Sequence, residues 1–221
     1  MKLLIISDTH LDPYFEKEKF EFLAKILEKA DRVVINGDFW DGYFWDFQNF
    51  VKSPWKKLFP LLKRKGAIYI TGNHDREYLI DKKLAKKLFC KEVVLQWKIK
   101  LNGKTYHVEH GHRILPFSDV KLNLDLRNKA IRGVLKTVKL AEKALFKTPV
   151  RRLVKDFYYK SKAEEMKRKV KRKDGVFYIF GHVHYPTFDK ERGIATSGSI
   201  EYGEASFIEV GKEVKLINQK Y

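Results

Sequence analysis

Runs of residues with metal-binding side chains are spread along this chain of 221 residues. They are Asp8-Thr9-His10, Gly37-Asp38, Gly72-Asn73-His74-Asp75, His110-Gly111-His112 and Gly181-His182-Val183-His184. Most of them follow a stretch whose composition is typical of a β-strand. Strands that lie side by side in a sheet bring their carboxyl ends to one edge. The sequence therefore predicts a composite metal site built from distant segments.

The histidines are concentrated in these runs. Six of the seven lie within them, and only His107 lies outside, where it alternates with Tyr106 and Val108 on a predicted strand and is interpreted as structural. Asp8 and His10 are two residues apart in an extended loop, so both side chains can face one cation. Each pair alone is common by chance, but the whole set is rare and predicts metal binding.

The first half of the chain predicts alternating strands and helices. Isoleucine- and leucine-rich runs predict buried strands, and apolar residues at helical spacing predict the helices between them. The order implies βαβ units and an α/β fold with parallel strands. Strands are expected at 2–7, 32–36 and 67–71, and helices at 15–30, 53–65 and 77–89.

The second half predicts antiparallel pairing. Alternating runs at 93–101 and 104–109 flank Asn102-Gly103, which is typical of a hairpin with a type I′ turn. A further buried strand is expected at 176–180. The segments 205–210 and 213–217, around Gly211-Lys212, predict a closing hairpin.

A basic helical insertion is expected between these halves. Residues 113–175 carry 20 Lys and Arg against 7 Asp and Glu, which accounts for most of the formal net charge of +18. Apolar positions at helical spacing run from Ile131 to Leu145, and a second stripe begins after Pro149 with Val150, Leu153, Val154 and Phe157. The insertion begins after His112 and ends before Gly181, so it could act as a lid or substrate wall. The alternative is that its stripes are core packed against the main domain.

Composition limits the class of protein. A hydrophobic content of 44% is ample for one packed domain, expected over 1–221 with the insertion at 113–175. The single cysteine, Cys90, cannot form an internal disulfide, and no apolar run approaches the roughly 18 residues of a membrane span. With a first strand at residue 2 leaving no room for a leader, we expect a cytoplasmic protein. The surplus of lysine also fits solubility or a heat-adapted surface.

The order of these motifs resembles the calcineurin-like metallophosphoesterases, whose pattern is Asp-x-His, Gly-Asp, Gly-Asn-His, His and Gly-His-x-His. The resemblance spans residues 8–184. It implies a β-sandwich flanked by helices (αββα), with the basic insertion as a helical cap. It also implies that Asp8, His10 and His184 hold one metal, that Asn73, His110 and His182 hold a second, and that Asp38 bridges them.

Such a centre predicts phosphoester hydrolysis. Asp8 and Asp38 in one pocket would repel each other, and two divalent ions remove that penalty. Two ions can activate a water as hydroxide and clamp phosphate oxygens during in-line displacement. His74 would stabilise the phosphoryl charge or protonate the leaving oxygen, and Asp75 would orient or charge His74. Ligands without thiolate favour manganese, iron or zinc over calcium. We take manganese as the working metal, with iron, zinc and nickel as alternatives.

Other acidic and histidine residues lie near the motifs. The functional interpretation of Asp41 is that it edges the pocket or orients a ligand histidine, and the alternative is that it faces water. Asp46 and Asp12 are expected to be solvated. One histidine of His110 and His112 is expected to be a ligand, while the other supports it or faces the substrate.

Within the family, the layout is similar to the UDP-2,3-diacylglucosamine pyrophosphatases. That likeness implies a nucleotide-sugar lipid substrate, with Arg151, Arg152 and Lys155 near the diphosphate or headgroup, and peripheral contact with an anionic membrane at its inner surface. Those enzymes usually have arginine where this chain has His74, so another phosphodiester or pyrophosphate substrate is kept as an alternative.

A hypothesis of another class makes the basic insertion a grip for nucleic acid. The protein would then be a nuclease or a nucleic-acid-binding protein in which Phe157-Tyr158-Tyr159 stack on bases and lysines track phosphates. Against it, the apolar stripe is regular enough for packing or lipid contact, and no nucleic-acid motif is recognised. A metal-free protein that retains only the fold is the third alternative.

Overall fold

The first of two sheets carries the parallel strands predicted from the amino-terminal half. The computed structural model describes residues 1–145 and 155–221. The strand order is β10-β11-β1-β2-β3-β4, with β12 paired to the other side of β11. β1 to β4 are parallel, and β11 is antiparallel to β1. The strands are β1 Leu3–Ile6, β2 Arg32–Asn36, β3 Ile68–Ile70, β4 Glu92–Val94, β10 Ile200–Glu201, β11 Glu204–Val210 and β12 Val214–Lys220.

The second sheet has five strands in the order β5-β6-β7-β9-β8. β6, β7 and β9 are parallel to one another, whereas β5 and β8 are antiparallel at the two edges. The strands are β5 Gln96–Leu101, β6 Lys104–Glu109, β7 Val176–Phe180, β8 Pro186–Asp189 and β9 Ile194–Ser197.

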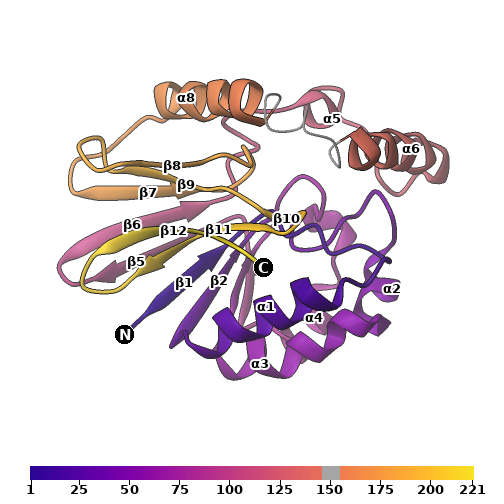
Figure 1. Cartoon of the computed structure of the whole chain (residues 1–221), viewed down its shortest axis with the longest axis horizontal. Coiled ribbons are helices and arrows are strands. Elements are labelled where there is room, and N and C mark those ends of the chain that lie inside the picture. Colours follow the sequence, from indigo (N-terminus) through magenta and orange to yellow (C-terminus); the bar gives the residue numbers. More distant parts are fainter. Residues whose placement is uncertain (146–154) are drawn as a thin grey trace.

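Helices cover the outer faces of the two sheets (Figure 1). α1 (Lys17–Glu28), α2 (Phe47–Lys52), α3 (Phe59–Arg64) and α4 (Lys82–Leu88) form one apolar core with the first sheet. A second core lies between the sheets, and a third lies between α8 (Lys160–Lys169) and the second sheet. The predicted αββα sandwich is confirmed.

The predicted helices of the first half are shorter and more broken than expected. The helix expected at 53–65 is a 3-10 turn at Pro54–Leu58 followed by α3, and α2 was not predicted. Ser53 is extended because a residue before proline disfavours the helical region, so the chain breaks there. The helix expected at 77–89 is likewise a 3-10 turn, Glu77–Leu79, followed by α4.

The strand expected at 93–101 is wrong in one respect. It is two strands, because the chain crosses at Leu95 from β4 in the first sheet to β5 in the second. The hairpin that follows is confirmed: Asn102 and Gly103 both have positive φ, at 50° and 78°, as a type I′ turn requires.

The segment between β6 and β7 is helical, as predicted. It contains α5 (Ser118–Lys121), α6 (Lys129–Leu145), a π-helical turn at Lys155–Tyr159 and α8. The second predicted stripe, at Val150, Leu153 and Val154, lies outside the described residues. In the described part of the chain, none of the helices combines the length and apolar content needed to cross a bilayer.

Candidate metal centre

The loops that follow five strands bring the candidate ligands to one edge of the two sheets. Asp8 follows β1, Asp38 follows β2 and Asn73 follows β3, while His110 follows β6 and the pair His182 and His184 follows β7. The first three come from one sheet and the others from the second. The site therefore lies where the carboxyl ends of both sheets meet, as the strand-end argument predicts.

The backbone at these positions is unusual. Eight described residues other than glycine have positive φ, and five are candidate ligands: Asp8, His10, Asp38, His182 and His184. A left-handed conformation costs an L-residue roughly 1–2 kcal/mol. Such residues cluster at functional sites, where the surrounding structure holds them in place. The fold thus maintains strained loops in order to aim these side chains.

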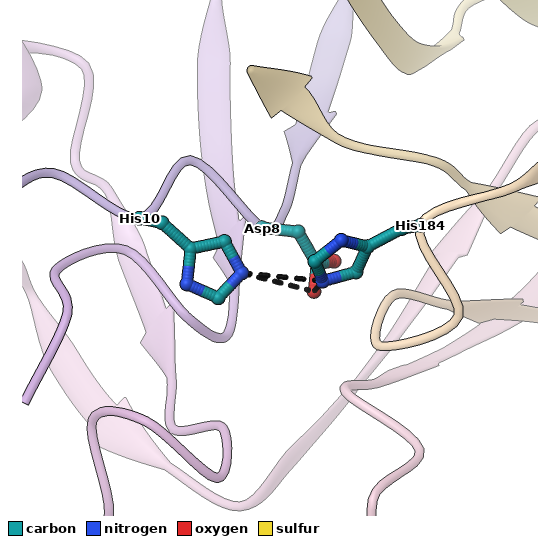
Figure 2. Close-up of side chains that lie close together, drawn as sticks. All are labelled: Asp8, His10 and His184. Carbon is teal, nitrogen blue, oxygen red and sulfur yellow. Dashed lines mark hydrogen bonds and ion pairs between the residues drawn. The ribbon is translucent and has the colours of Figure 1, made fainter. Parts of the chain in front are cut away.

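The first group consists of Asp8, His10 and His184 (Figure 2). His184 Nε2 lies 3.1 Å from Asp8 Oδ1 and 3.2 Å from His10 Nε2. His10 Nε2 is 3.9 Å from the same carboxylate oxygen. Figure 2 shows the imidazole rings of His10 and His184 next to the Asp8 carboxylate, each with a nitrogen facing it. These atoms could be ligands of one ion.

The second group consists of Asp38, His110 and His182, with Asn73 beside them. His110 Nε2 is 3.2 Å from Asp38 Oδ2 and 3.2 Å from Asn73 Oδ1. Asp38 Oδ2 also lies 3.9 Å from His10 Nε2 of the first group. Asp38 is therefore placed between the two groups.

The donor atoms of both groups suit divalent cations. Asp8 Oδ1 and Asp38 Oδ2 are buried and receive no hydrogen bond from the described residues, although imidazole nitrogens face them at 3.1 and 3.2 Å. A buried carboxylate oxygen without a partner is costly. The oxygen and nitrogen atoms face one another without a hydrogen atom aligned between them. A cation could bind to their lone pairs, so the residues fit the metal that their sequence pattern implies.

The pKa values of the candidate histidine ligands also favour a cation at this site. Burial opposes a charge on His184, but the carboxylates of Asp8 and Glu201 outweigh it and raise its pKa to about 10. Burial and the charge of His110 lower the pKa of His182 to about 3. Burial lowers the pKa of His10 to about 3 as well. The carboxylates thus attract positive charge, while His10 and His182 are held in the neutral form that binds metals.

His74 lies beside this centre but is held by a different carboxylate than predicted. Its Nδ1 is 3.0 Å from Asp41 Oδ1, and Asp41 Oδ2 is 3.7 Å from His10 Nδ1. Burial opposes a charge on the His74 ring, yet Asp41 and Asp38 outweigh it and raise its pKa. Asp41 is therefore the carboxylate that orients and charges His74, which is one of the two interpretations of Asp41 drawn from sequence.

The expectation that Asp75 would orient His74 is wrong. The Asp75 carboxylate is buried and accepts hydrogen bonds from the backbone N–H groups of Asp38, Phe39 and Gly72 and from the Tyr69 hydroxyl, at 2.6–3.0 Å. Burial and the nearby Asp38 carboxylate raise its pKa to about 6. The physical reason is that the Asp75 carboxylate is taken up by Tyr69 and by backbone N–H groups, whereas the His74 ring contacts Asp41. Asp75 therefore holds in place the loop that carries Asp38, and it does not contact His74.

The other predicted contacts have mixed outcomes. His112 is partly buried, with its ring 5.4 Å from that of His110 and 6.3 Å from that of His182, so it borders the second group. Arg151 and Arg152 lie outside the described residues, and the side chain of Lys155 is not described either.

Asp46 is exposed and caps α2, as expected for a solvated carboxylate. Asp12, expected to be solvated, is buried and accepts a hydrogen bond from the Tyr14 N–H.

Sequence reasoning missed one carboxylate at the centre. Glu201 Oε2 lies 3.3 Å from His184 Nδ1, and Glu201 is buried at the end of β10. A glutamate in a two-residue strand gives no signal by itself.

Residues of the helical segment form the other side of the site, and these too were missed. A cavity of about 140 Å³ opens onto Asp38, Asn73, His74, His182 and His184. Its remaining lining comes largely from the segment 113–175, with Phe117, Leu135, Val138, Lys139 and Tyr159. The ring of Phe117 lies 4.2 Å from that of His182, and the ring of Tyr159 stacks on His184 at 5.3 Å. This segment therefore covers the metal centre.

Gly72 offers a test of how tightly the centre is packed. A Cβ added there would overlap the Asp38 carboxylate and lie 2.7 Å from the Asp38 backbone nitrogen. We expect Gly72→Ala to lower the free energy of unfolding by about 1–3 kcal/mol, as overpacking usually does. Urea unfolding in a chelator measures this. Gly133→Ala in α6 is the control, because nothing lies near its added Cβ. Equal stability of the two variants would contradict the prediction.

Comparison with known proteins gives a family and a fold. The family model described as calcineurin-like phosphoesterase matches residues 1–186. The chain is similar in structure to an archaeal phosphodiesterase, with a TM-score of 0.52 and 17% identity over 99% of this chain and 100% of that one. It is also similar to Yfce, a phosphoesterase from E. coli, with a TM-score of 0.51 and 16% identity over 96% and 88% of the two chains. No curated protein sequence gives a significant match.

Proposed function

This chain belongs to the calcineurin-like phosphoesterase family and is a metal-dependent phosphoesterase, and we propose that it hydrolyses a phosphodiester or pyrophosphate bond. The observation that carries this proposal is the convergence of two groups, Asp8, His10 and His184 and Asp38, His110 and His182, beside a cavity that Asp38, His182 and His184 line. Asp8 Oδ1 and Asp38 Oδ2 receive no hydrogen bond from the described residues, and imidazole nitrogens of His184 and His110 lie 3.1 and 3.2 Å from them.

Two divalent ions would be held by these residues. Asp8, His10 and His184 would bind one, and Asn73, His110 and His182 would bind the other. Asp38 would bridge them, which its distances of 3.2 Å to His110 and 3.9 Å to His10 support. Such ions supply a water of lowered pKa and neutralise the charge on a phosphate.

The residues around the ions have separate tasks in this proposal. Asp41 holds His74 Nδ1 at 3.0 Å, so Nε2 is the ring nitrogen left for the substrate, and it donates a proton to the leaving oxygen. Glu201 orients His184 through Nδ1, and the backbone carbonyl of Asn36 orients His110 through its Nδ1 at 2.8 Å. Asp75 holds the Asp38 loop in place.

Manganese is the metal we propose, with iron, zinc and nickel as the alternatives. The candidate donors are carboxylate, amide and imidazole groups without thiolate, and the one cysteine, Cys90, is buried in the core of the first sheet. Mixed oxygen and nitrogen donors suit these metals better than calcium.

The substrate we propose is amphipathic, such as the nucleotide-sugar lipid of a UDP-2,3-diacylglucosamine pyrophosphatase. We also propose that 113–175 is a cap inserted into a single domain. Supporting the substrate proposal, apolar side chains of Phe117, Leu135 and Val138 from this segment line the cavity. Val134 and Leu140 of α6 are exposed on a strongly basic segment. That combination suits peripheral contact of a cytoplasmic protein with an anionic membrane surface. Val134 belongs to the predicted apolar stripe, and its exposure contradicts the alternative that the whole stripe is core.

The nuclease hypothesis has one observation in its favour. Phe157 is 85% exposed and Tyr158 is 47% exposed beside the basic residues of α8, as stacking platforms for bases would be. The lipid and nucleic-acid hypotheses are distinguished by comparing how strongly the intact protein binds anionic vesicles and a single-stranded oligonucleotide. Preferential oligonucleotide binding and cleavage would favour the nuclease.

Hydrolysis of an activated ester tests the shared chemistry. Manganese-loaded protein is expected to release p-nitrophenol from bis-p-nitrophenyl phosphate, because the centre should accept any accessible phosphodiester. Protein treated with a chelator is the control and should be inactive until metal is restored. Inactivity with manganese, iron, zinc and nickel alike would contradict the proposed function.

A further inference from the structure

A second cavity, which we call the outer cavity, lies on the outer face of the second sheet. Its volume is about 610 Å³, compared with about 140 Å³ for the cavity at the metal centre, and none of the described residues lines both. Strands β5 to β7 form one wall, and the end of α8 with the connection to β7 forms the other. Figure 1 shows α8 above this sheet and the connection that runs from its end to β7. Pockets for small organic ligands typically have volumes of roughly 300–1,000 Å³.

Lysines from both walls face the outer cavity. Lys98 lies on β5, Lys169 ends α8, and Lys171 and Lys173 follow in the connection to β7. Lys169 is paired with Glu165 at 2.9 Å, whereas the other three lysines form no ion pair with any described residue. Like charges that share a small space repel each other, and a bound anion would remove that repulsion.

The balance of charge stays positive when the groups at the edge of the outer cavity are included. Glu109 is the one carboxylate in its described lining. Arg172 and Asp174 lie in the connection and cancel, while Arg113, whose charge acts on Glu109, adds a cation. With Glu165 included, three carboxylates stand against six cations. A cavity whose walls carry mainly one sign of charge concentrates ligands of the opposite sign.

Hydrogen bonds hold the walls of the outer cavity in place. The backbone N–H of Lys173 donates to the Tyr178 hydroxyl at 3.0 Å, and the ring of Tyr178 stacks on that of His107 at 5.2 Å. Arg172 Nη1 donates to the backbone carbonyl of Arg192, in the turn before β9, at 3.0 Å. The connection that carries the lysines is thus anchored to the sheet at two points. A site that is formed before its ligand arrives loses less conformational freedom on binding.

The remaining lining indicates what accompanies the anion. Ile114, Val170 and Val176 provide apolar surface beside the lysines. The Glu109 carboxylate lies 3.5 Å from His107 Nε2, and its side chain is 15% exposed, so it can accept a hydrogen bond from a ligand. Lysine binds phosphate as a point charge. The cavity therefore suits a molecule with phosphate at one end and, at the other, an apolar ring part that carries hydroxyl or amine donors.

We propose that the outer cavity is a second ligand site and that it binds a nucleoside phosphate. Lys98, Lys171 and Lys173 bind the phosphate oxygens. Val170 and Val176 contact the base, and Glu109 accepts a hydrogen bond from a ribose hydroxyl or an amine of the base. The site goes beyond the proposed hydrolysis, because its described lining is separate from that of the metal centre and its anion is held by lysines.

Lys171→Gln combined with Lys173→Gln tests this in the manganese-loaded full-length protein. Calorimetry with ADP is expected to show binding weakened about 10-fold, because two partly exposed charge contacts are lost. Lys98→Gln, on the opposite wall, should weaken ADP binding about 3-fold. Hydrolysis of bis-p-nitrophenyl phosphate should keep its kcat and KM in these variants, since none of the three lysines lines the cavity at the metal centre.

Photolabelling with 8-azido-ADP shows where the nucleotide binds. The label is expected in peptides that contain 98–114 or 169–178, and it should decrease in the double lysine variant. Label confined to segments of the metal centre, such as 38–43, 73–74 and 182–184, would overturn the proposal. An ADP affinity that the double variant leaves unchanged would overturn it as well.

Lys56→Gln combined with Lys57→Gln is the matched control. Both are exposed lysines of the Pro54–Leu58 turn, which packs on the first sheet, so ADP affinity should not change. Equal weakening by the two pairs would show attraction to the overall charge of the protein and no specific site. Binding of a single-stranded oligonucleotide that depends on Lys171 and Lys173 but is not displaced by ADP would assign these lysines to nucleic acid instead.

The second site and the proposed hydrolysis fail in different ways. Esterase activity in a protein that does not bind ADP at the outer cavity would refute only the second site. ADP binding that depends on the lysines, in a protein inactive with every metal tested, would refute the hydrolysis and leave the second site in place.

Discussion

Asp38→Asn is expected to release bound metal and to lower phosphoesterase activity by at least about 100-fold. Asp38 Oδ2 lies 3.2 Å from His110 Nε2 and 3.9 Å from His10 Nε2, so its charge serves both groups of candidate ligands. Even residues that only support a metal ligand cost 10- to 100-fold when they are changed, and a bridging carboxylate should cost more. Elemental analysis after gel filtration measures the metal, and hydrolysis of bis-p-nitrophenyl phosphate measures the activity.

Asp46→Asn is the matched control for this experiment. Asp46 is an exposed aspartate eight residues further along the chain, where it caps α2, and asparagine caps helices about as well as aspartate. This variant should keep its metal, its activity and its melting temperature. Full metal occupancy in folded Asp38→Asn would show that Asp38 does not bridge the two ions.

His74→Ala is expected to keep both metals but to lose about 100- to 10,000-fold in turnover, the usual contribution of a general acid. The ring of His74 lines the cavity and is oriented by Asp41 at 3.0 Å, whereas its backbone N–H alone contacts Asp38 Oδ1, at 2.9 Å. The substitution therefore removes the proposed proton donor and leaves that backbone contact. Turnover should fall further for esters with more basic leaving groups, because those depend more on protonation.

His107→Gln provides the comparison for His74. His107 lies on β6, and its ring stacks on Tyr178 at 5.2 Å away from the cavity lining, so its loss should not affect turnover. Asp41→Asn should reproduce part of the His74→Ala effect, since it removes the partner of the imidazole. A loss of turnover that is equal for good and poor leaving groups would assign His74 to charge stabilisation rather than acid catalysis. Unchanged turnover would remove His74 from the chemistry.

Much of the architecture could be predicted because it is encoded locally. Continuous apolar runs mark strands that are buried on both faces, and the polar residues directly after them must lie at the carboxyl edge of a sheet. This reasoning placed Asp8, Asp38 and Asn73 near one another without any distance information. The same local encoding gave the turn at Asn102-Gly103, where two residues with positive φ are required.

The points at which the structure interrupts or shortens the predicted helices and strands were marked less clearly in the sequence. Ser53 and Pro54 mark the start of the predicted helix at 53–65, but they give no sign that α2 ends just before them. The apolar pattern runs through Leu95 without interruption, and there the partner strands decide, because β4 pairs with β3 and β5 pairs with β6. Strand pairing is a long-range choice that a single-segment pattern does not contain.

What the sequence pattern determined by itself was the set of candidate ligands, an α/β fold with parallel strands and the position of the helical insertion, whereas the αββα arrangement was implied by the family resemblance. Only the tertiary structure decided which carboxylate serves which histidine. Asp41 reaches His74 across 33 residues and Glu201 reaches His184 across 17, whereas Asp75, the neighbour in sequence, turns into the loop. The sequence does not distinguish Lys139 from the other lysines, and only the position of α6 over the centre places it beside the candidate ligands. The physical reason is that side-chain partners are set by the packing of distant elements, while local pattern records only which face of its own element a residue occupies.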